Sequence, residues 1–165
     1  MAEVSEQPKK QVSATEPDWS RETSKYYWNP GVRLIRSIRF YQQYQNKPFL
    51  KWLKYVGVIR YRFWSVVSGA DIPLNCKIGG GLLMPHPNGI VIHPEAEIGP
   101  NCLIFKQVTI GSNGRDVPKI GGHVDIGAGA KVLGDITIGN HARVGANAVV
   151  LKDVREYYTA KGIAA

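Results

Sequence analysis

The chain has 165 residues, 44% of them apolar, which is enough for one packed domain and a small appendage. Its two cysteines form no CxxC motif and no Cys/His cluster, which argues against a disulfide-stapled fold and against zinc. The net charge of +8 favours anionic partners, such as phosphorylated metabolites, nucleic acid or a lipid surface.

Residues 1–23 are polar and rich in Pro, Ser, Glu and Lys. They contain no apolar run like that of a signal peptide. They cannot bury enough apolar surface to offset the entropy of ordering, so the composition predicts a disordered tail. No stretch of the chain approaches the roughly eighteen uninterrupted apolar residues of a membrane-spanning helix. We therefore expect a cytoplasmic protein.

Residues 24–68 form a segment that we call the basic aromatic segment. It holds nine Lys and Arg residues, no Asp or Glu, and twelve of the sixteen aromatic residues. Val32, Ile35 and Ile38 recur every three residues among arginines, which predicts a helix. A second helical stretch starts at Pro48, a residue suited to a first helical turn.

Two roles for the basic aromatic segment stay open. It could lie on anionic lipid at the inner face of the membrane, as a peripheral contact. Its aromatic side chains could instead pack as a helical cap on the domain that follows. A nucleic-acid role would fit the charge, but the sequence has no matching motif, so we expect none.

From residue 69 to residue 165 an apolar residue recurs at every sixth position in three runs. These anchor residues are Ile72, Ile78 and Met84, then Ile92, Ile98, Ile104 and Ile110, then Ile120, Ile126, Val132, Ile138, Val144 and Val150. An α-helix favours a spacing near 3.6 and a half-exposed strand a spacing of about two. A spacing of six fits a short strand plus a turn, repeated so that every anchor points into one interior.

Three such sides close a triangular coil of about eighteen residues, with coils about 4.8 Å apart. Small residues four places after an anchor, such as Ala96, Cys102 and Ala130, suit the corners. About four coils fit between positions 72 and 155. The sequence therefore predicts an all-β solenoid of hexapeptide repeats behind a short helical segment.

Two stretches interrupt the count of six. HPNGIV at 86–91 adds two residues, and GSNGRDVPK at 111–119 is predicted to protrude as a loop. Insertions in a solenoid fall on its surface, where binding and catalytic groups are commonly built.

The longest stretches between and after these interruptions are IHPEAEIGPNCLIFKQVTIGSNG and PKIGGHVDIGAGAKVLGDITIGNHARVGANAVVLKDV, and the chain ends in TAKGIAA. In these stretches the chain resembles the serine acetyltransferase branch of the hexapeptide-repeat acyltransferases. The resemblance covers 69–165. It implies a left-handed parallel β-helix, a homotrimer and acetyl-CoA as the donor. We expect no metal, because the sequence has no Cys/His cluster.

The resemblance also implies a catalytic pair. His86 in PHPNG matches the family's base, and Asp71 in DIPLN matches the aspartate that precedes it, at the same spacing. The repeat places both near one corner, because one eighteen-residue coil above Asp71 is position 89. Histidine has a pKa suited to removing a proton near neutral pH, and a carboxylate fixes its tautomer.

Neither Cys76 nor Cys102 is a strong candidate for a covalent acyl carrier, because both occupy small-residue packing positions of the repeat. We therefore expect direct transfer, with the oxyanion near a backbone N–H of Gly111. The resemblance places CoA beside two alanines, an arginine and the entry of the loop: Ala128, Ala146, Arg143, Gly111, Ser112 and Asn113.

The acceptor half of the site departs from the resemblance. Asp116 and Val117 replace the Arg-His pair of the family's loop, and Pro85 replaces an aspartate beside the base. Losing such charged partners would cost amino-acid recognition about several kcal/mol. We therefore expect a sugar hydroxyl in polysaccharide biosynthesis as the acceptor, as in the related exopolysaccharide (colanic acid-type) O-acetyltransferases. The alternative is a serine O-acetyltransferase of cysteine biosynthesis with an altered pocket.

The remaining histidines are His93, His123 and His141, and we expect them at the surface. Their scatter argues against a γ-class carbonic anhydrase on the same solenoid, since that enzyme needs three histidines meeting at one metal ion.

Overall fold

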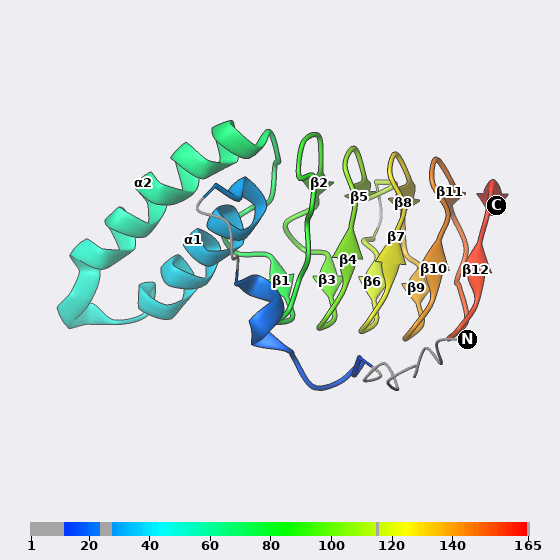
Figure 1. The fold of residues 1–165 in the computed structure, drawn as a ribbon, viewed down its shortest axis with the longest axis horizontal. Helices are drawn as coiled ribbons and strands as arrows, with labels where there is room; N and C mark the ends of the chain where they lie inside the picture. The colour runs from blue at the N-terminus through cyan, green and yellow to red at the C-terminus, as the bar shows by residue number, and fades with distance from the viewer. Residues whose placement is uncertain (1–11, 24–27, 115, 165) are drawn as a thin grey trace, which may run out of the picture.

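A computed structural model describes residues 12–23, 28–114 and 116–164 of the chain. A helical hairpin stands at one end of a long parallel β-solenoid, and the chain winds from that hairpin to the C-terminus coil by coil (Figure 1). The predicted all-β solenoid behind a helical segment is confirmed.

The hairpin consists of α1 (Pro30–Tyr44) and α2 (Lys51–Ser68), with the short 3-10 helix η2 (Pro48–Leu50) between them. The Asn29 side chain caps α1 by accepting a hydrogen bond from the Val32 N–H at 3.1 Å. α2 ends at Gly69, whose φ of 65° is in the left-handed region that glycine adopts without strain. The start of α1 and the end of α2 therefore lie where the local sequence favours them.

α1 lies against the first coil of the solenoid. Its buried side chains Leu34, Ile35 and Ile38 join the core, and the Gln42 amide donates to the carbonyl oxygens of Leu74 and Cys76 at 3.0 and 3.1 Å. α2 packs on the other side of α1 and is the outermost element in Figure 1. Most of the cap on the solenoid is therefore α1, and α2 adds Tyr61 and Trp64, which pack against the same core.

The strands form three parallel sheets, one for each side of the triangular coil. The first sheet contains β1 (Lys77–Ile78), β3 (Glu97–Ile98), β6 (Lys119–Ile120) and β9 (Thr137–Ile138). The second contains β4 (Leu103–Ile104), β7 (Asp125–Ile126), β10 (Arg143–Val144) and β12 (Thr159–Ala160). The third contains β2 (Val91–Ile92), β5 (Thr109–Gly111), β8 (Lys131–Leu133), β11 (Val149–Val150) and β13 (Ile163–Ala164), which gives about five turns rather than four.

The pairing register shows how many residues each coil contains. Lys77 pairs with Glu97, a step of 20, because the corner at 86–91 adds two residues to the repeat. Glu97 pairs with Lys119, a step of 22, because the loop after β5 adds four. The anchors stay in register across both insertions, with every one of them buried. The insertions thus change the surface and leave the interior unchanged.

The described part of the expected disordered tail, residues 12–23, lies along one edge of the solenoid and ends in the 3-10 helix η1 (Trp19–Glu22) (Figure 1). The side chain of Asn101 accepts from the Asp18 N–H at 2.8 Å and donates to the carbonyl oxygens of Ser13 and Glu16. The bare backbone of Gly122 lets Ala14 approach so closely that a Cβ there would collide with its carbonyl oxygen.

The buried carboxylate of Glu22 fastens the end of this segment. It accepts hydrogen bonds from the N–H groups of Gly81 and Leu82 and pairs with the Arg39 guanidinium at 3.0 Å. Arg39 in turn donates to two carbonyl oxygens of the first coil, so one ion pair joins the segment, α1 and the solenoid. Among the described residues, neither helix is long and apolar enough to cross a membrane.

Candidate active site

Asp71 starts the first coil, three residues after Ser68, the last residue of α2. Its backbone N–H donates to the Ile90 carbonyl at 2.8 Å, and its own carbonyl accepts from the Ile92 N–H at 3.0 Å, which pairs it with Val91. The expected partner position was 89. Two extra residues in this coil account for the difference. Leu83 is level with Leu103 and Asn88 with Lys106, so the extra residues lie between Leu83 and Asn88, at the turn that carries His86.

His86 lies in that same corner, between Leu83, which bridges to Leu103, and strand β2. Its neighbour Pro87 is buried and accepts a hydrogen bond from the Ile90 N–H at 3.1 Å, so the corner has a fixed turn. The side chains of His86 and Asp71 are both exposed. In the part of the chain that the structure describes, no hydrogen bond or ion pair joins these two side chains.

The Asp71 carboxylate also faces the helical hairpin. It contributes to a hollow of about 440 Å³ between α2 and the first coil, lined by Val58, Tyr61, Arg62, Ser65, Val66, Asp71 and Leu74. Burial raises the pKa of the Tyr61 hydroxyl, and the nearby Asp71 charge raises it further. The Asp71 side chain is therefore accessible, and together with burial it raises the pKa of the neighbouring Tyr61.

Both cysteines are buried and protonated. Burial, with a smaller contribution from Asp71, raises the pKa of the Cys76 thiol to about 12. Burial also raises the pKa of Cys102 to about 11, and its sulfur lies 3.2 Å from the Gly121 carbonyl. Because the thiolate is the nucleophilic form, neither residue is suited to carry an acyl group.

The corner that holds His86 continues along the solenoid as a ladder of backbone hydrogen bonds. Consecutive coils are joined there by the N–H of one residue and the carbonyl oxygen of another on the coil below: Gln107 to Asn88 at 2.9 Å, Gly129 to Lys106 at 2.9 Å and Asn147 to Ala128 at 2.8 Å. Ala128 and Ala146 lie in this corner on successive coils. His86 and the two alanines predicted to contact CoA are therefore on one edge of the molecule.

Arg143 lies next to that edge, on β10. Its side chain is exposed and its Nε is 3.9 Å from the Asp125 carboxylate, a loose pair that leaves the guanidinium accessible to an anion. The remaining residues predicted to contact CoA are Gly111, Ser112 and Asn113, at the opposite border of the sheet that contains β5. Within one chain, these three residues are therefore separated from His86 by the width of that sheet.

The loop after β5 holds the residues that depart from the family resemblance. Val117 is buried, with 8% of its surface exposed, so it packs under the loop and offers no surface to a substrate. Asp116 is exposed and its carboxylate accepts from the Val117 N–H at 3.2 Å. Pro85 is exposed beside His86. Position 115, in the same loop, lies outside the described residues.

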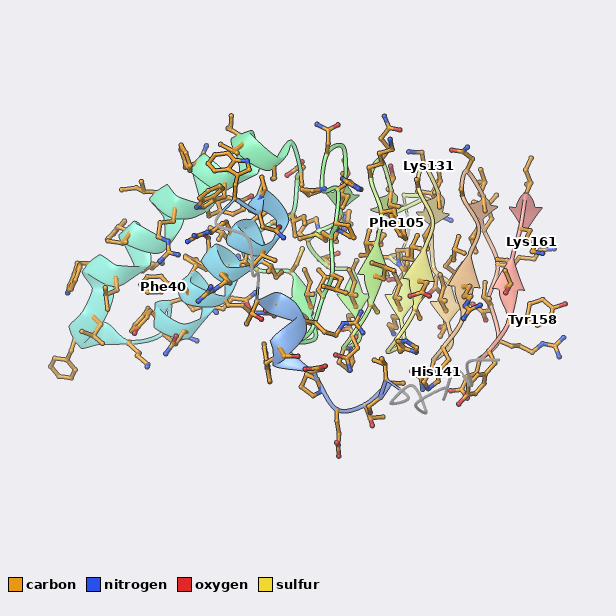
Figure 2. The ribbon with its side chains drawn as sticks, viewed as in Figure 1. Phe40, Phe105, Lys131, His141, Tyr158 and Lys161 are labelled. Carbon is orange, nitrogen blue, oxygen red and sulfur yellow. The ribbon has the colours of Figure 1, made fainter. Side chains whose placement is uncertain are left out.

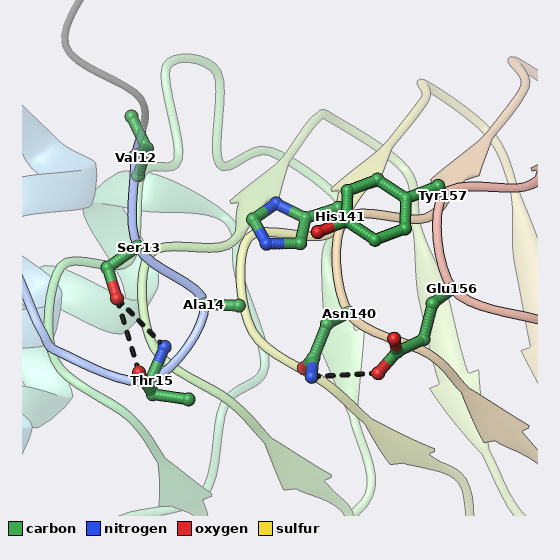
Figure 3. Close-up of a pocket in the computed structure, with 8 residues that line it drawn as sticks. All are labelled: Val12, Ser13, Ala14, Thr15, Asn140, His141, Glu156 and Tyr157. Atoms are coloured by element: carbon green, nitrogen blue, oxygen red, sulfur yellow. Dashed lines mark hydrogen bonds between the residues drawn. The ribbon is translucent and has the colours of Figure 1, made fainter.

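A separate hollow of about 370 Å³ lies at another corner, between residues 12–15 and the C-terminal coils (Figure 3). There the ring nitrogens Nδ1 of His123 and His141 are 2.8 Å apart, and the ring of Tyr157 stacks on His141 with centroids 4.7 Å apart. His123 and His141, which we expected to be solvated, are thus half-buried and meet edge-on. The repeat spacing puts them one coil apart, a signal from which their contact could have been predicted.

The comparisons with known proteins agree with the fold. The model of the family described as bacterial transferase hexapeptide (six repeats) matches residues 118–152. A solved serine acetyltransferase in complex with CoA superposes on 82% of this chain and 56% of its own, with a TM-score of 0.70 and 37% identity. The soybean serine acetyltransferase complexed with serine superposes with a TM-score of 0.70 and 35% identity, over 81% and 55% of the two chains. The solenoid is thus the left-handed β-helix of these enzymes.

The sequence relatives belong to the same group. A probable serine acetyltransferase 3 of Oryza sativa subsp. japonica is 52% identical over 103 residues, which cover 60% of this chain and 34% of the relative. The serine acetyltransferase of Haemophilus influenzae is 34% identical over 145 residues, or 84% and 54% of the two chains. The chain therefore spans between a third and about half of the length of these relatives.

These relatives contradict the predicted sugar acceptor and its place in polysaccharide biosynthesis. That prediction rested on the absence of the family's side chains at positions 85, 116 and 117, and no residue of the chain itself indicated a sugar. One of the three, Val117, is a packing residue. The matches support membership of the hexapeptide-repeat acyltransferases, and the relatives found within that family are serine acetyltransferases.

Proposed function

We propose that this protein is an acetyl-CoA-dependent O-acetyltransferase that acts on the hydroxyl of L-serine. The identity of 52% over 103 residues to a probable serine acetyltransferase supports this proposal most strongly. The serine acetyltransferase complexed with CoA, similar over 82% of this chain, supports the choice of donor.

In the proposed reaction His86 is the general base. Its exposed imidazole removes the proton of the serine hydroxyl as the oxygen attacks the thioester carbonyl carbon. The C–O bond forms, the C–S bond then breaks, and the imidazolium returns the proton to the CoA sulfur. Because the two cysteines stay protonated, we propose a single direct transfer with no acyl-enzyme.

Asp71 has a supporting role in this proposal. Its carboxylate stabilises the imidazolium that forms on His86 and favours the tautomer with a free base nitrogen. The two side chains start without a mutual hydrogen bond, and catalytic hydrogen bonds commonly tighten only when the substrate is bound. We expect Asp71 to turn from the hollow beside Tyr61 toward His86 in the complex.

We further propose a homotrimer with an active site between each pair of neighbours. In one chain the loop at 111–118 and the corner with His86 lie on opposite borders of one sheet. A neighbouring solenoid, packed side by side, could bring its own loop against the His86 corner. CoA would then lie in the groove between the two, along Ala128 and Ala146 of one chain, with Arg143 near a phosphate.

The residues at 85, 116 and 117 bear on how tightly serine binds. An exposed proline, an exposed aspartate and a buried valine supply no cation for the serine carboxylate within the described loop. We therefore propose that the enzyme has a high KM for serine, while kcat depends on His86 and is preserved.

A coupled assay tests this function. CoA thiol release from acetyl-CoA is followed with L-serine, with L-alanine as the control that lacks the hydroxyl, and O-acetylserine is identified by mass spectrometry. We expect product with serine alone and none with the His86→Ala variant. Intact CoA binding together with no turnover of serine at any concentration would refute the proposal.

A further inference from the structure

α2 exposes a continuous apolar face along its whole length. This stripe, which we call the α2 stripe, consists of Trp52, Tyr55, Val56, Ile59, Phe63 and Val66. The steps of three and four residues place all six side chains on one side of a helix. All six are exposed, Ile59 by 70% and Val66 by 83%, although an ordinary amphipathic helix buries this face.

The opposite face of α2 is the one that packs on the protein. Gly57 lies against the backbone of Tyr41, and Arg60 lies over the ring of Phe40 with its guanidinium 5.2 Å from the ring centroid. Phe40 lies between the two helices, while other side chains project from α2 on the side away from α1 (Figure 2). The α2 stripe therefore faces solvent along most of its length, while its C-terminal member Val66 borders the hollow beside Asp71 and Phe63 makes an edge contact with Trp64.

The charges around the stripe indicate what can cover it. The basic aromatic segment has nine Lys and Arg residues and no acidic residue. On a helical wheel Arg60 and Arg62 fall on the two sides of the stripe, with Ile59 and Phe63 between them. A second copy of the same segment would bring like charges together, whereas an anionic surface would neutralise them.

We infer that α2 binds a bilayer containing anionic lipids and lies parallel to its surface. Trp52, Ile59 and Phe63 enter the boundary between head groups and acyl chains, and the exposed Arg62 beside them reaches the phosphates, while the Arg60 guanidinium stays over Phe40. Tyr55 is suited to the same depth, since its ring is apolar and its hydroxyl polar. The helix cannot span the bilayer, and α1 and the solenoid remain on its aqueous side. This inference is independent of the acceptor proposed above.

Vesicle sedimentation with the full chain tests the inference. Vesicles of phosphatidylcholine alone are compared with vesicles containing one quarter phosphatidylglycerol. We expect binding to the anionic vesicles, weakened by high salt. Ile59→Glu should lower the partition coefficient about tenfold or more, since it removes an apolar group that enters the lipid and adds a negative charge that the anionic lipid repels.

Ile163→Glu is the matched control, because Ile163 is 76% exposed at the far end of the solenoid, and it should bind as the wild type does. Trp52 gives an independent signal: a blue shift of its emission with anionic vesicles, lost in Trp52→Phe. Equal binding of Ile59→Glu and wild type would overturn the inference, as would equal binding to neutral and anionic vesicles. So would a lipid-free oligomer that Ile59→Glu dissociates, because the stripe would then be a protein interface.

Discussion

The Nδ1 atoms of His123 and His141 lie 2.8 Å apart on consecutive coils, so one ring must donate a proton and the other must accept it. Burial lowers the pKa of His123, the Asp125 carboxylate opposes this, and His141 lowers it further. Only a pair with at least one neutral ring can keep this contact.

This pair should make stability depend on pH. The folded pKa of His123 lies below its unfolded value of about 6.5, so the unfolded chain binds more protons between the two. The contribution is present above the unfolded pKa and is lost as the pH falls through that window. We expect His123→Asn to flatten the decline in urea midpoint from pH of about 8 to about 5.5. His93→Asn is the control, and an equal decline in all three proteins would contradict the assignment.

Removing the proposed base should abolish turnover while leaving the donor site in place. We expect His86→Ala to lower kcat by about 10² to 10⁴, the usual contribution of a general base. Asp71→Asn should cost less than His86→Ala, because it keeps the base. Calorimetry with CoA should give an unchanged Kd for both variants. Near-normal turnover of His86→Ala would rule out the mechanism.

The cysteines should be inert in the folded protein. With pKa values of about 12 and about 11, Cys76 and Cys102 have almost no thiolate at neutral pH. Mass spectrometry should find no iodoacetamide adduct on the native chain and two adducts after urea unfolding. The Cys76→Ala and Cys102→Ala variants should keep most of the acetyl transfer activity. An acetylated cysteine in a quenched reaction would argue against direct transfer.

The Glu22–Arg39 ion pair should contribute measurably to folding. Glu22→Gln leaves the Arg39 guanidinium without its charge partner, so the free energy of unfolding should fall by about 3 kcal/mol. This value is at the lower end of the usual cost of breaking a buried ion pair, because Arg39 is partly exposed. Glu97→Gln, which breaks the exposed pair with Lys77, is the matched control and should change little. If both variants unfold at the same urea concentration as the wild type, the pair does not stabilise the fold.

The sequence predicted the interior of the solenoid because one rule governs it. An anchor at every sixth position from Ile120 to Val150 must point inward in any coil of three equal sides, and all of these anchors are buried. The first coil was predicted less well, because a strict count of eighteen leaves out its two extra residues, which the register places between Leu83 and Asn88. Their place moved the partner of Asp71 from position 89 to Val91.

Other features depend on contacts between distant parts of the chain, which a local pattern does not show. Residues 12–23 are polar by composition, yet Asn101 and Gly122 provide a specific track for them. Val117 looked like a lost substrate contact because exposure cannot be seen from a loop sequence, and the structure buries it. This misreading of Val117 contributed to the wrong prediction of a sugar acceptor.

The segment at 12–23 changes how a stack of coils can come apart. A solenoid held only by nearest neighbours can fray from either end, one rung at a time. Here residues 12–23 contact three successive coils: Glu22 binds the first at Gly81, Asn101 of the second binds Asp18, and Ala14 packs on Gly122 of the third. The Glu22–Arg39 ion pair also joins this segment to α1. These three coils must therefore open together, whereas the C-terminal coils beyond this segment can exchange their amide hydrogens separately.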